Sequence, residues 1–315
     1  MASDCRIFKA GPPDALNAMH ILSLTTLATL AAAQLAYAGI ILFDGRIPLS
    51  TGNETLDAST DPFLTAVKGK TEPATHYSGF LGDSVNPTPL WNALPEQVIS
   101  VRIDNTSVFV PGNGDPQLGF RRTELIAVKN GSASNLDALM ETGVTRFHFS
   151  IKADTQYPLN YTHEYQIVFI EPSDGTHVFG VQLGSPFTNP TGTLPVAEAD
   201  WFKILDHSLN VLFKTPFTLD VWHNFAVEVD WEELTLQVLY STEGEPLDTV
   251  TSVVSNPTVA QGAAGQGDFH VGVLKLPLVD PSDPPEDQGD VVHHGLQEGI
   301  VEGLLYSGIF VERIR

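Results

Sequence analysis

Runs of alternating apolar and polar residues recur along the chain and predict β-strands. They occupy residues 98–103, 146–152, 225–230, 234–240 and 304–311. No stretch of the sequence shows the 3.6-residue apolar period of an amphipathic helix. Clusters of Gly, Pro, Asn and Asp separate the runs, as at 111–116 and 171–175. Many short strands divided by turns predict an all-β fold, a β-jelly roll or concanavalin-like sandwich of two antiparallel sheets.

Residues 39–315 show no internal repeat and no interior linker, so we expect a single domain. Two stretches read as long loops or insertions. The first, residues 49–97, is rich in Thr, Pro and Asn, and the second, residues 277–298, is rich in Pro and Asp. The second is either a lid or a solvated excursion.

Residues 1–38 are expected to be a signal peptide that is removed on export. An apolar run at 21–38 closes on Ala-Tyr-Ala, the small-x-small form of a signal-peptidase site. A membrane anchor fits less well, because the run contains Ser, Thr and Gln and has no basic flank. Translation could begin at Met19, since the stretch before it has no feature that a signal peptide requires. We therefore predict a secreted, extracellular protein.

The composition and net charge of the chain exclude several kinds of partner and of stabilising bond. The 315 residues are 42% hydrophobic, enough for a sizeable core, and only 17% charged. Lys and Arg number 16 against 38 Asp and Glu, for a formal net charge of −22. Nucleic acids and anionic membranes are therefore disfavoured as partners. The one cysteine, Cys5, lies in the segment expected to be removed, so no disulfide framework is expected. We expect the protein to act as a monomer.

Four N-glycosylation sequons agree with export. They begin at Asn53, Asn105, Asn130 and Asn160. Each has the form Asn-x-Ser/Thr, which marks a surface position in a secreted protein. Such triplets also arise by chance, so each of the four is a weak signal alone.

Polar residues on the non-core face of predicted strands are the candidate site. In residues 119–125, Arg122 and Glu124 are two positions apart and share a face. Arg122 would hold Glu124 ionised, as a base or nucleophile requires. An exposed ion pair without a catalytic role explains the same spacing equally well.

A second strand, residues 163–169, carries another such pair. Tyr165, Ile167 and Phe169 are expected on its core side, so Glu164 and Gln166 point together to the opposite face. A carboxylate beside an amide can hydrogen-bond sugar hydroxyls in fixed directions.

The same parity argument separates three histidines. His148 is expected to point outward from residues 146–152. His223 shares a face with the apolar residues of its strand, so a buried structural role is expected. His270 faces away from the apolar residues of its strand, and Gly272 leaves room beside it for a ligand. His270 is therefore the stronger functional candidate.

Two carboxylates and a histidine on one sheet face suit glycosidic bond hydrolysis. One group protonates the leaving oxygen, and another activates water or attacks the anomeric carbon. The sequence carries no Gly-x-Ser-x-Gly, His-Glu-x-x-His, phosphate-binding or dinucleotide-binding motif. We expect no cofactor and no metal. The four aspartates of the 280–290 loop could hold Ca²⁺, although a solvated loop explains them better.

The chain resembles glycoside hydrolase family 131, a group of secreted, largely fungal β-glucanases with a β-jelly-roll fold. The segments that carry the resemblance are residues 43–46, 119–125, 162–166, 221–227 and 269–275. The Arg-Arg-x-Glu-Leu and His-Glu-Tyr-Gln strands, in this order, are the most specific of these. The resemblance implies a broad-specificity β-glucanase that acts on β-1,3-, β-1,4- and β-1,6-linked glucose.

The resemblance also implies a catalytic cluster of Arg122, Glu124, Glu164 and one histidine, for which parity favours His270 over His223. Glu124 would act as base or nucleophile and Glu164 or His270 as proton donor, with inversion weakly favoured. The side chains expected to line the substrate site are those of Arg121, His148, His163, Gln166, His223 and Lys275. The 277–298 loop is longer than the resemblance implies and could narrow the cleft.

Two other functions stay open at this point. A jelly-roll polysaccharide lyase would use Arg122 to clamp a uronate carboxylate, with Gln166 and a His or Tyr beside it. A non-catalytic carbohydrate-binding or cell-wall protein would use exposed tryptophans as a sugar-stacking platform. An ultraviolet-absorbing product from a uronate polymer distinguishes the first, and binding to glucan without turnover distinguishes the second.

Overall fold

A computed structural model describes residues 39–91, 94–112, 114–188, 190–257 and 267–314. The predicted signal peptide, residues 1–38, and the alternative start at Met19 lie outside the described residues. In the part of the chain that is described, no helix has the length and apolar character needed to cross a membrane.

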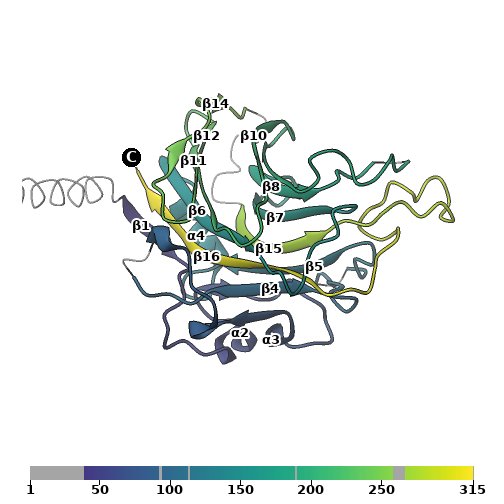
Figure 1. Cartoon of the computed structure of the whole chain (residues 1–315), viewed down its shortest axis with the longest axis horizontal. Coiled ribbons are helices and arrows are strands. Elements are labelled where there is room, and N and C mark those ends of the chain that lie inside the picture. The colour runs from purple at the N-terminus through teal and green to yellow at the C-terminus, as the bar shows by residue number, and fades with distance from the viewer. Residues whose placement is uncertain (1–38, 92–93, 113, 189, 258–266, 315) are drawn as a thin grey trace, which may run out of the picture. The chain divides into compact units, whose positions relative to one another are not determined.

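Two antiparallel sheets account for most of the described chain and confirm the predicted all-β sandwich (Figure 1). The nine-stranded sheet has the order β13 (Asp248–Thr249), β12 (Thr235–Thr242), β11 (His223–Asp230), β6 (Val144–Ala153), β16 (Glu302–Arg313), β4 (Ile99–Ile103) and β3 (Ser78–Phe80), with β1 (Ile40–Asp44) paired to β16 and β14 (Val254–Ser255) to β12. The seven-stranded sheet has the order β10 (Val211–Pro216), β9 (Trp201–Asp206), β8 (Phe179–Gly184), β7 (Glu164–Glu171), β15 (Asp268–Lys275), β5 (Arg121–Ala127) and β2 (Phe63–Leu64).

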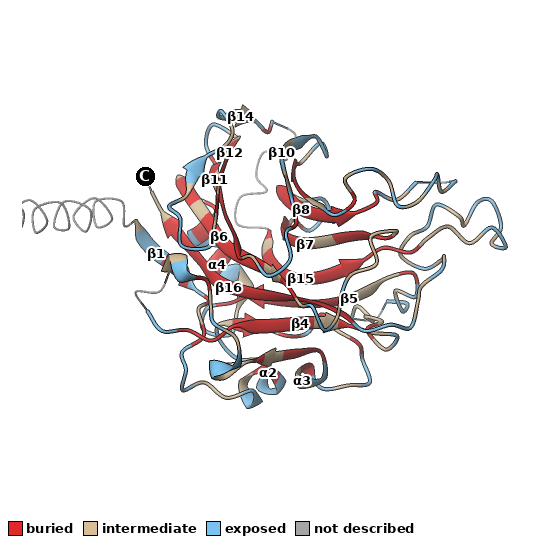
Figure 2. Ribbon diagram, in the orientation of Figure 1, coloured by how far each residue is buried: buried red, intermediate tan, exposed pale blue. Residues whose placement is uncertain are grey.

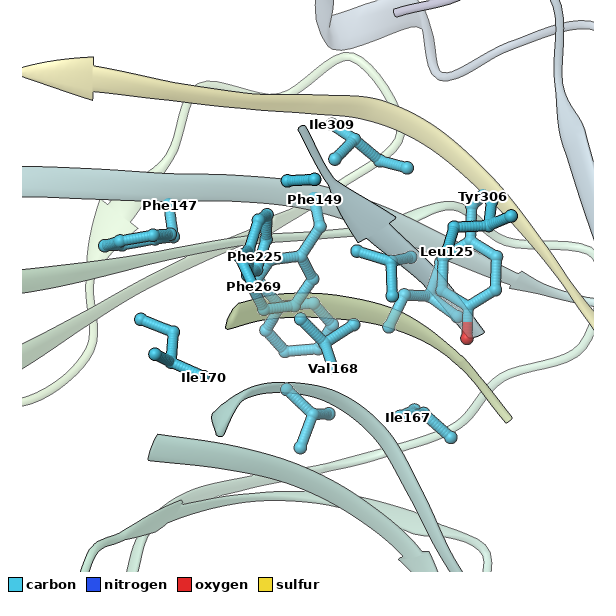
Figure 3. Packing of buried hydrophobic residues seen from close by; sticks show 14 of the residues in the cluster. Leu125, Phe147, Phe149, Ile167, Val168, Ile170, Phe225, Phe269, Tyr306 and Ile309 are labelled. Carbon is cyan, nitrogen blue, oxygen red and sulfur yellow. The ribbon is translucent and has the colours of Figure 1, made fainter. Parts of the chain in front are cut away.

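Apolar side chains from both sheets pack between them and form the main core (Figure 3). The alternation in β6 and β11 places Phe147, Phe149 and Phe225 in this layer, as predicted. Phe149 and Phe225 stack with ring centroids 5.6 Å apart, and Phe269 of β15 meets Phe147 edge-on at 5.1 Å. Figure 2 shows that the long strands are largely buried, whereas the long loops are not. The face of the seven-stranded sheet that points away from this core is called the outer face below.

A β-bulge reverses the alternation half-way along β7. Tyr165 and Ile167 face the core before it, whereas Val168 and Ile170 face the core after it. The register with β8 shifts at the same point. Phe169 therefore lies on the outer face, where it stacks on two histidines. Its predicted core position is wrong, because one extra residue changes the parity of every residue that follows.

The segment 49–97 is more structured than the predicted loop. It contains α2 (Glu54–Ala58), β2, α3 (Ala74–Tyr77), β3 and the 3₁₀ turns η1 (Gly82–Ser84) and η2 (Pro89–Trp91). Because β2 pairs with β5 and β3 with β4, the segment adds an edge strand to each sheet. With α4 (Ala133–Met140), the α-helices of the described chain are all of eight residues or fewer. Helices this short cannot display a clear 3.6-residue period.

The 277–298 loop leaves the seven-stranded sheet after β15 and is tied down at its base (Figure 1). Leu278 and Leu296 pair across the base in a β-bridge. The backbone N–H of Gly119 donates to the carbonyl of Val292 at 2.9 Å, and the amide of Gln297 donates to the carbonyl of Gly119 at 2.7 Å. The loop base therefore packs against the segment that leads into β5.

Candidate active site

Arg122 and Glu124 of β5 form a buried ion pair on the outer face. The guanidinium donates from Nε to Oε1 and from Nη2 to Oε2 of Glu124, both at 2.6 Å. The side chain of Glu124 is 0% exposed. A Cβ on the neighbouring Gly272 would lie 2.7 Å from the Cα of Glu124. Gly272 thus makes room for β5 and Glu124, rather than for a ligand as we expected.

His270 of β15 completes the partners of Glu124. Its Nδ1 lies 2.7 Å from Oε2 of Glu124. Burial raises the pKa of Glu124, but Arg122 and His270 together overcome this effect and lower the pKa to about 2. Because the carboxyl is ionised, we infer that Nδ1 carries a hydrogen and donates it. Nε2 is then the ring nitrogen left for chemistry.

Glu171, at the end of β7, is a candidate that the sequence reasoning missed. Its Oε2 lies 3.9 Å from Nε2 of His270 and 3.7 Å from Nη2 of Arg122. Burial raises the pKa of Glu171, with Glu124 adding to the effect and His270 and Arg122 opposing it. Its side chain is 29% exposed, so it is the carboxyl of this group that a substrate can reach. The bulge in β7 brings Glu171 to the outer face, and no sequence signal marks that bulge.

Three rings stack across the outer face beside these groups. Phe169 lies between His270 and His177, with ring centroids 4.8 Å and 4.2 Å away. Burial lowers the pKa of His177 to about 4, and the nearby His270 adds to this effect. His177 is therefore a neutral ring at ordinary pH, and the stack fixes the plane of the His270 imidazole.

Glu164 and Gln166 also lie on the outer face, nearer the other end of β7. The amide of Gln166 donates to Oε1 of Glu164 at 2.9 Å, and the backbone N–H of Phe187 donates to Oε2 at 2.7 Å. Glu164 lines a small hollow together with the loops that follow β8 and β15. Along β7 it lies seven residues, about 23 Å, from Glu171. Glu164 is therefore not part of the Arg122–Glu124–His270–Glu171 cluster.

A metal ion does not fit this cluster well. One ligand atom each from Glu124, Glu171 and His270 lies within 4.8 Å of the others, and no second such group occurs among the described residues. However, both oxygens of Glu124 already accept hydrogen bonds, and the Arg122 guanidinium contacts both carboxylates. A cation placed there would be repelled by the guanidinium. The arrangement serves proton transfer better than metal binding.

Another hollow lies on the other sheet. It has a volume of about 290 Å³ and lies at β11 and β12 of the nine-stranded sheet. The residues that line it are Glu228, Asp230, Glu233, Thr235, Gln237 and Val253. This lining contains three carboxylates, but it lacks the buried histidine and arginine that order the carboxylates on the outer face. We therefore assign the chemistry to the outer face.

Comparison with known proteins identifies the family. The sequence model of the "Glycoside hydrolase 131 catalytic N-terminal domain" matches residues 41–315. The chain belongs to glycoside hydrolase family 131. The resemblance expected from the sequence is thereby confirmed, and the protein is a glycoside hydrolase.

Solved family 131 structures share this fold. The catalytic domain of a GH131 β-glucanase from Podospora anserina is 24% identical, with a TM-score of 0.64 over 87% of this chain and 96% of that one. The catalytic domain of the family 131 protein from Coprinopsis cinerea is also 24% identical, with a TM-score of 0.62 over 87% and 95%. No curated protein sequence matches the chain significantly. These likenesses establish the jelly-roll fold that we predicted.

Two expected substrate contacts of this family 131 member lie in a buried network instead. Lys275 is 0% exposed and donates to Glu302 at 2.6 Å and to Glu298 at 2.5 Å. His163 is 1% exposed, with Nε2 2.9 Å from the same Glu298 carboxylate. The hydroxyl of Tyr165 donates to Glu302 at 2.6 Å. This network joins the base of the 277–298 loop to the interior, so Lys275 and His163 have structural partners.

The other expected contacts are also placed away from the cluster. Arg121 donates to backbone carbonyls at the start of β5 and has the opposite parity to Arg122. His148 does point outward from β6, but from the nine-stranded sheet, where it lies 2.9 Å from Glu312. His223 is 1% exposed and hydrogen-bonds Tyr240, in agreement with the predicted buried role. Of the sequence candidates, the structure brings together Arg122, Glu124 and His270.

The expected modification and calcium positions are all described. Asn53, Asn105 and Asn130 are exposed. Asn160 is half-buried, and its amide nitrogen donates to Glu298 at 2.6 Å. Within the described residues, the aspartates of the 280–290 loop do not gather into a three-ligand group.

Proposed function

We propose that this protein hydrolyses β-linked glucans by acid–base chemistry at Glu171 and His270. The observation that carries the proposal is the hydrogen bonding of Glu124, which uses both oxygens on Arg122 and His270 and is 0% exposed. A carboxylate held in this way has no free oxygen directed at a substrate. We therefore assign Glu124 a positioning role, in place of the base or nucleophile role considered from the sequence.

Glu171 is the proposed proton donor. Burial favours its protonated form, and its exposed fraction allows contact with a glycosidic oxygen. His270 is the proposed base. Glu124 behind Nδ1 stabilises the imidazolium that forms when Nε2 takes a proton from water. Arg122 keeps Glu124 ionised and so maintains this arrangement.

The distance between acid and base constrains the reaction. Oε2 of Glu171 and Nε2 of His270 are 3.9 Å apart, whereas acid and base in inverting glycosidases are about 6.5–9.5 Å apart. One of the two must turn aside when a sugar binds. Glu171 is the movable one, since His270 is held by Glu124 and stacked on Phe169. Without a free carboxylate nucleophile, water attacks directly, and the product has inverted configuration.

A neutral glucan is the substrate that best fits the surrounding charge. The chain carries a net charge of −22, which opposes the approach of a uronate polymer. A related catalytic domain is described as a β-glucanase. We extend the proposal to β-1,3-, β-1,4- and β-1,6-linked glucose. No cofactor has a part in the proposed reaction.

The test is a substrate panel with product analysis. Purified protein is incubated with laminarin, mixed-linkage glucan and a uronan, and reducing ends, anomeric configuration and ultraviolet absorbance are followed. The proposal predicts reducing sugar of inverted configuration from at least one glucan. An unsaturated, ultraviolet-absorbing product from the uronan would instead establish the lyase, and binding without turnover would establish a binding protein.

We also propose that the protein acts outside the cell, as a monomer. The apolar segment 21–38 and the exposed sequons at Asn53, Asn105 and Asn130 support secretion. N-terminal sequencing of protein recovered from the medium tests this directly, with Gly39 as the expected first residue. A recovered protein whose first residue lies within residues 1–38 would contradict the proposed cleavage site.

A further inference from the structure

The tryptophans differ in their surroundings, and one of them lies on the outer face. Trp222 and Trp231 are 2% and 7% exposed and pack among buried apolar residues. Trp91 meets Phe310 of the nine-stranded sheet edge-on at 5.0 Å. Trp201, in β9 of the seven-stranded sheet, is half-buried. Of the four tryptophans, all of which are described, Trp201 is therefore the one available as an aromatic surface on the outer face.

Trp201 points to the same face as the catalytic groups. Phe202 and Ile204, the alternate residues of β9, face the core, so Trp201 points away from it. The ammonium of Lys214 lies 5.5 Å from the indole centroid and 2.6 Å from the Glu198 carboxylate. These contacts hold the ring in place before any ligand arrives, which lowers the entropic cost of binding.

Gln182 of β8 lies between Trp201 and the catalytic groups. It is 7% exposed, and its side chain points to the outer face because Val181 and Leu183 face the core. Within the described residues its amide makes no side-chain hydrogen bond. Neither amide atom is among the fully buried side-chain atoms that lack a partner, so the amide stays open to the outer face, where it can hydrogen-bond a ligand hydroxyl.

The backbone register gives the position of this surface relative to His270. His270 pairs with Phe169, Phe169 with Gly180, and Gly180 with Leu205, across four neighbouring strands. Trp201 is four residues from Leu205 on β9. The separation is thus about 14 Å across the strands and about 13 Å along them, which is several sugar units.

We propose that Gln182 and Trp201 form a distal binding site for the same glucan chain that is cut at Glu171 and His270. The inference rests on the proposed function. The indole covers the apolar face of a glucose ring, and the Gln182 amide donates to and accepts from its hydroxyls. The enzyme therefore engages several consecutive glucose units and discriminates long glucan chains from short ones.

The experiment compares long and short substrates. For the full protein and its variants, kcat/KM is measured on a glucan polymer and on the matching di- and trisaccharides. Affinity for oligosaccharides of increasing length is measured by calorimetry in a His270→Asn background. The variants are Trp201→Ala, Trp201→Phe and Gln182→Ala. Leu219→Ala is the control, because Leu219 is 58% exposed in the turn before β11 of the other sheet.

Trp201→Ala is expected to lower the long-to-short ratio of kcat/KM by about 3- to 10-fold, as the loss of one aromatic contact requires. Gln182→Ala lowers the same ratio, Trp201→Phe restores most of it, and Leu219→Ala keeps it at the wild-type value. In the His270→Asn background, affinity for oligosaccharides is expected to rise with chain length, and adding Trp201→Ala is expected to abolish this rise. This measurement tests the same binding site without turnover. An active wild type whose ratio is the same in Trp201→Ala overturns this inference alone. A wild type that neither cuts nor binds any glucan overturns the proposed function and this inference together.

Discussion

Replacing Glu124 by Gln removes the negative charge that holds Arg122 and His270 together. Burial raises the pKa of Glu124, but its partners lower it to about 2, against an ordinary value of 4.5. At 1.36 kcal/mol per pKa unit this difference corresponds to about 3 kcal/mol of stability. The variant also leaves the buried Arg122 guanidinium with only the more distant Glu171 carboxyl, at 3.7 Å, which adds to the cost. We expect a loss of about 3–5 kcal/mol at pH 7 and a fall in Tm of roughly 6–10 °C.

The direction in which stability changes with pH follows from the lowered pKa of Glu124. Because the folded-state pKa of Glu124 is lowered, its contribution is present above about pH 4.5 and is lost as the pH falls towards 2. Urea unfolding is measured from pH 7 down to pH 3 for the wild type and the variant. The difference between the two shrinks steadily on the acid side of pH 4.5.

The control is Glu233→Gln, which changes an exposed carboxylate on the nine-stranded sheet side of the molecule. It is expected to lie within about 0.5 kcal/mol of the wild type. A Glu124→Gln variant that loses less than 1 kcal/mol at pH 7, or whose deficit is the same at pH 7 and pH 3, would show that the ion pair is not the strong interaction that we describe.

Three other predictions follow from particular residues. Burial, together with the carboxylates Asp268 and Glu141, raises the pKa of Asp137 to about 8. The free energy of unfolding should therefore fall between about pH 4 and pH 8, on the order of 1 kcal/mol per pH unit. Asp137→Asn should flatten this fall in urea unfolding at pH 5 and pH 8. Parallel pH dependences of the wild type and the variant would contradict the prediction. Gly272→Ala places a methyl group 2.7 Å from the Cα of Glu124, so we expect lower stability and a lower kcat. A variant with wild-type kcat would show that this close approach does not position the cluster. Lys275→Met breaks a fully buried ion pair with Glu302 and should lower the free energy of unfolding by about 3–5 kcal/mol without raising KM. A raised KM in the folded variant would instead show that Lys275 contacts the substrate.

The fold was predictable because alternation is a local property. The parity of β5, β6, β11 and β15 correctly separates core from non-core side chains, including Phe147 from His148 and Val271 from His270. Parity does not state which sheet a strand joins. His148 points outward as expected, but from the nine-stranded sheet, far from the partners that the sequence suggested.

The candidate site was predictable only in part. Arg122, Glu124 and His270 come together because β5 and β15 are neighbours in regular register. Glu171 was missed because a bulge in β7 changes the parity of the strand, and nothing in its sequence indicates where an extra residue is accommodated. Lys275 shares the parity of Phe269, Val271 and Val273, so its inward position follows from the alternation rule rather than from family resemblance.

The central claim is that Glu171 and His270 carry out the hydrolysis of a β-glucan. The most direct measurement is the initial rate of reducing-sugar release by the wild type and by Glu171→Gln on the same glucan, with Glu233→Gln as the matched control. We predict release by the wild type, a similar rate for the control, and a rate about 100-fold or more lower for Glu171→Gln. A Glu171→Gln variant that is folded and cuts the glucan at the wild-type rate would contradict the account.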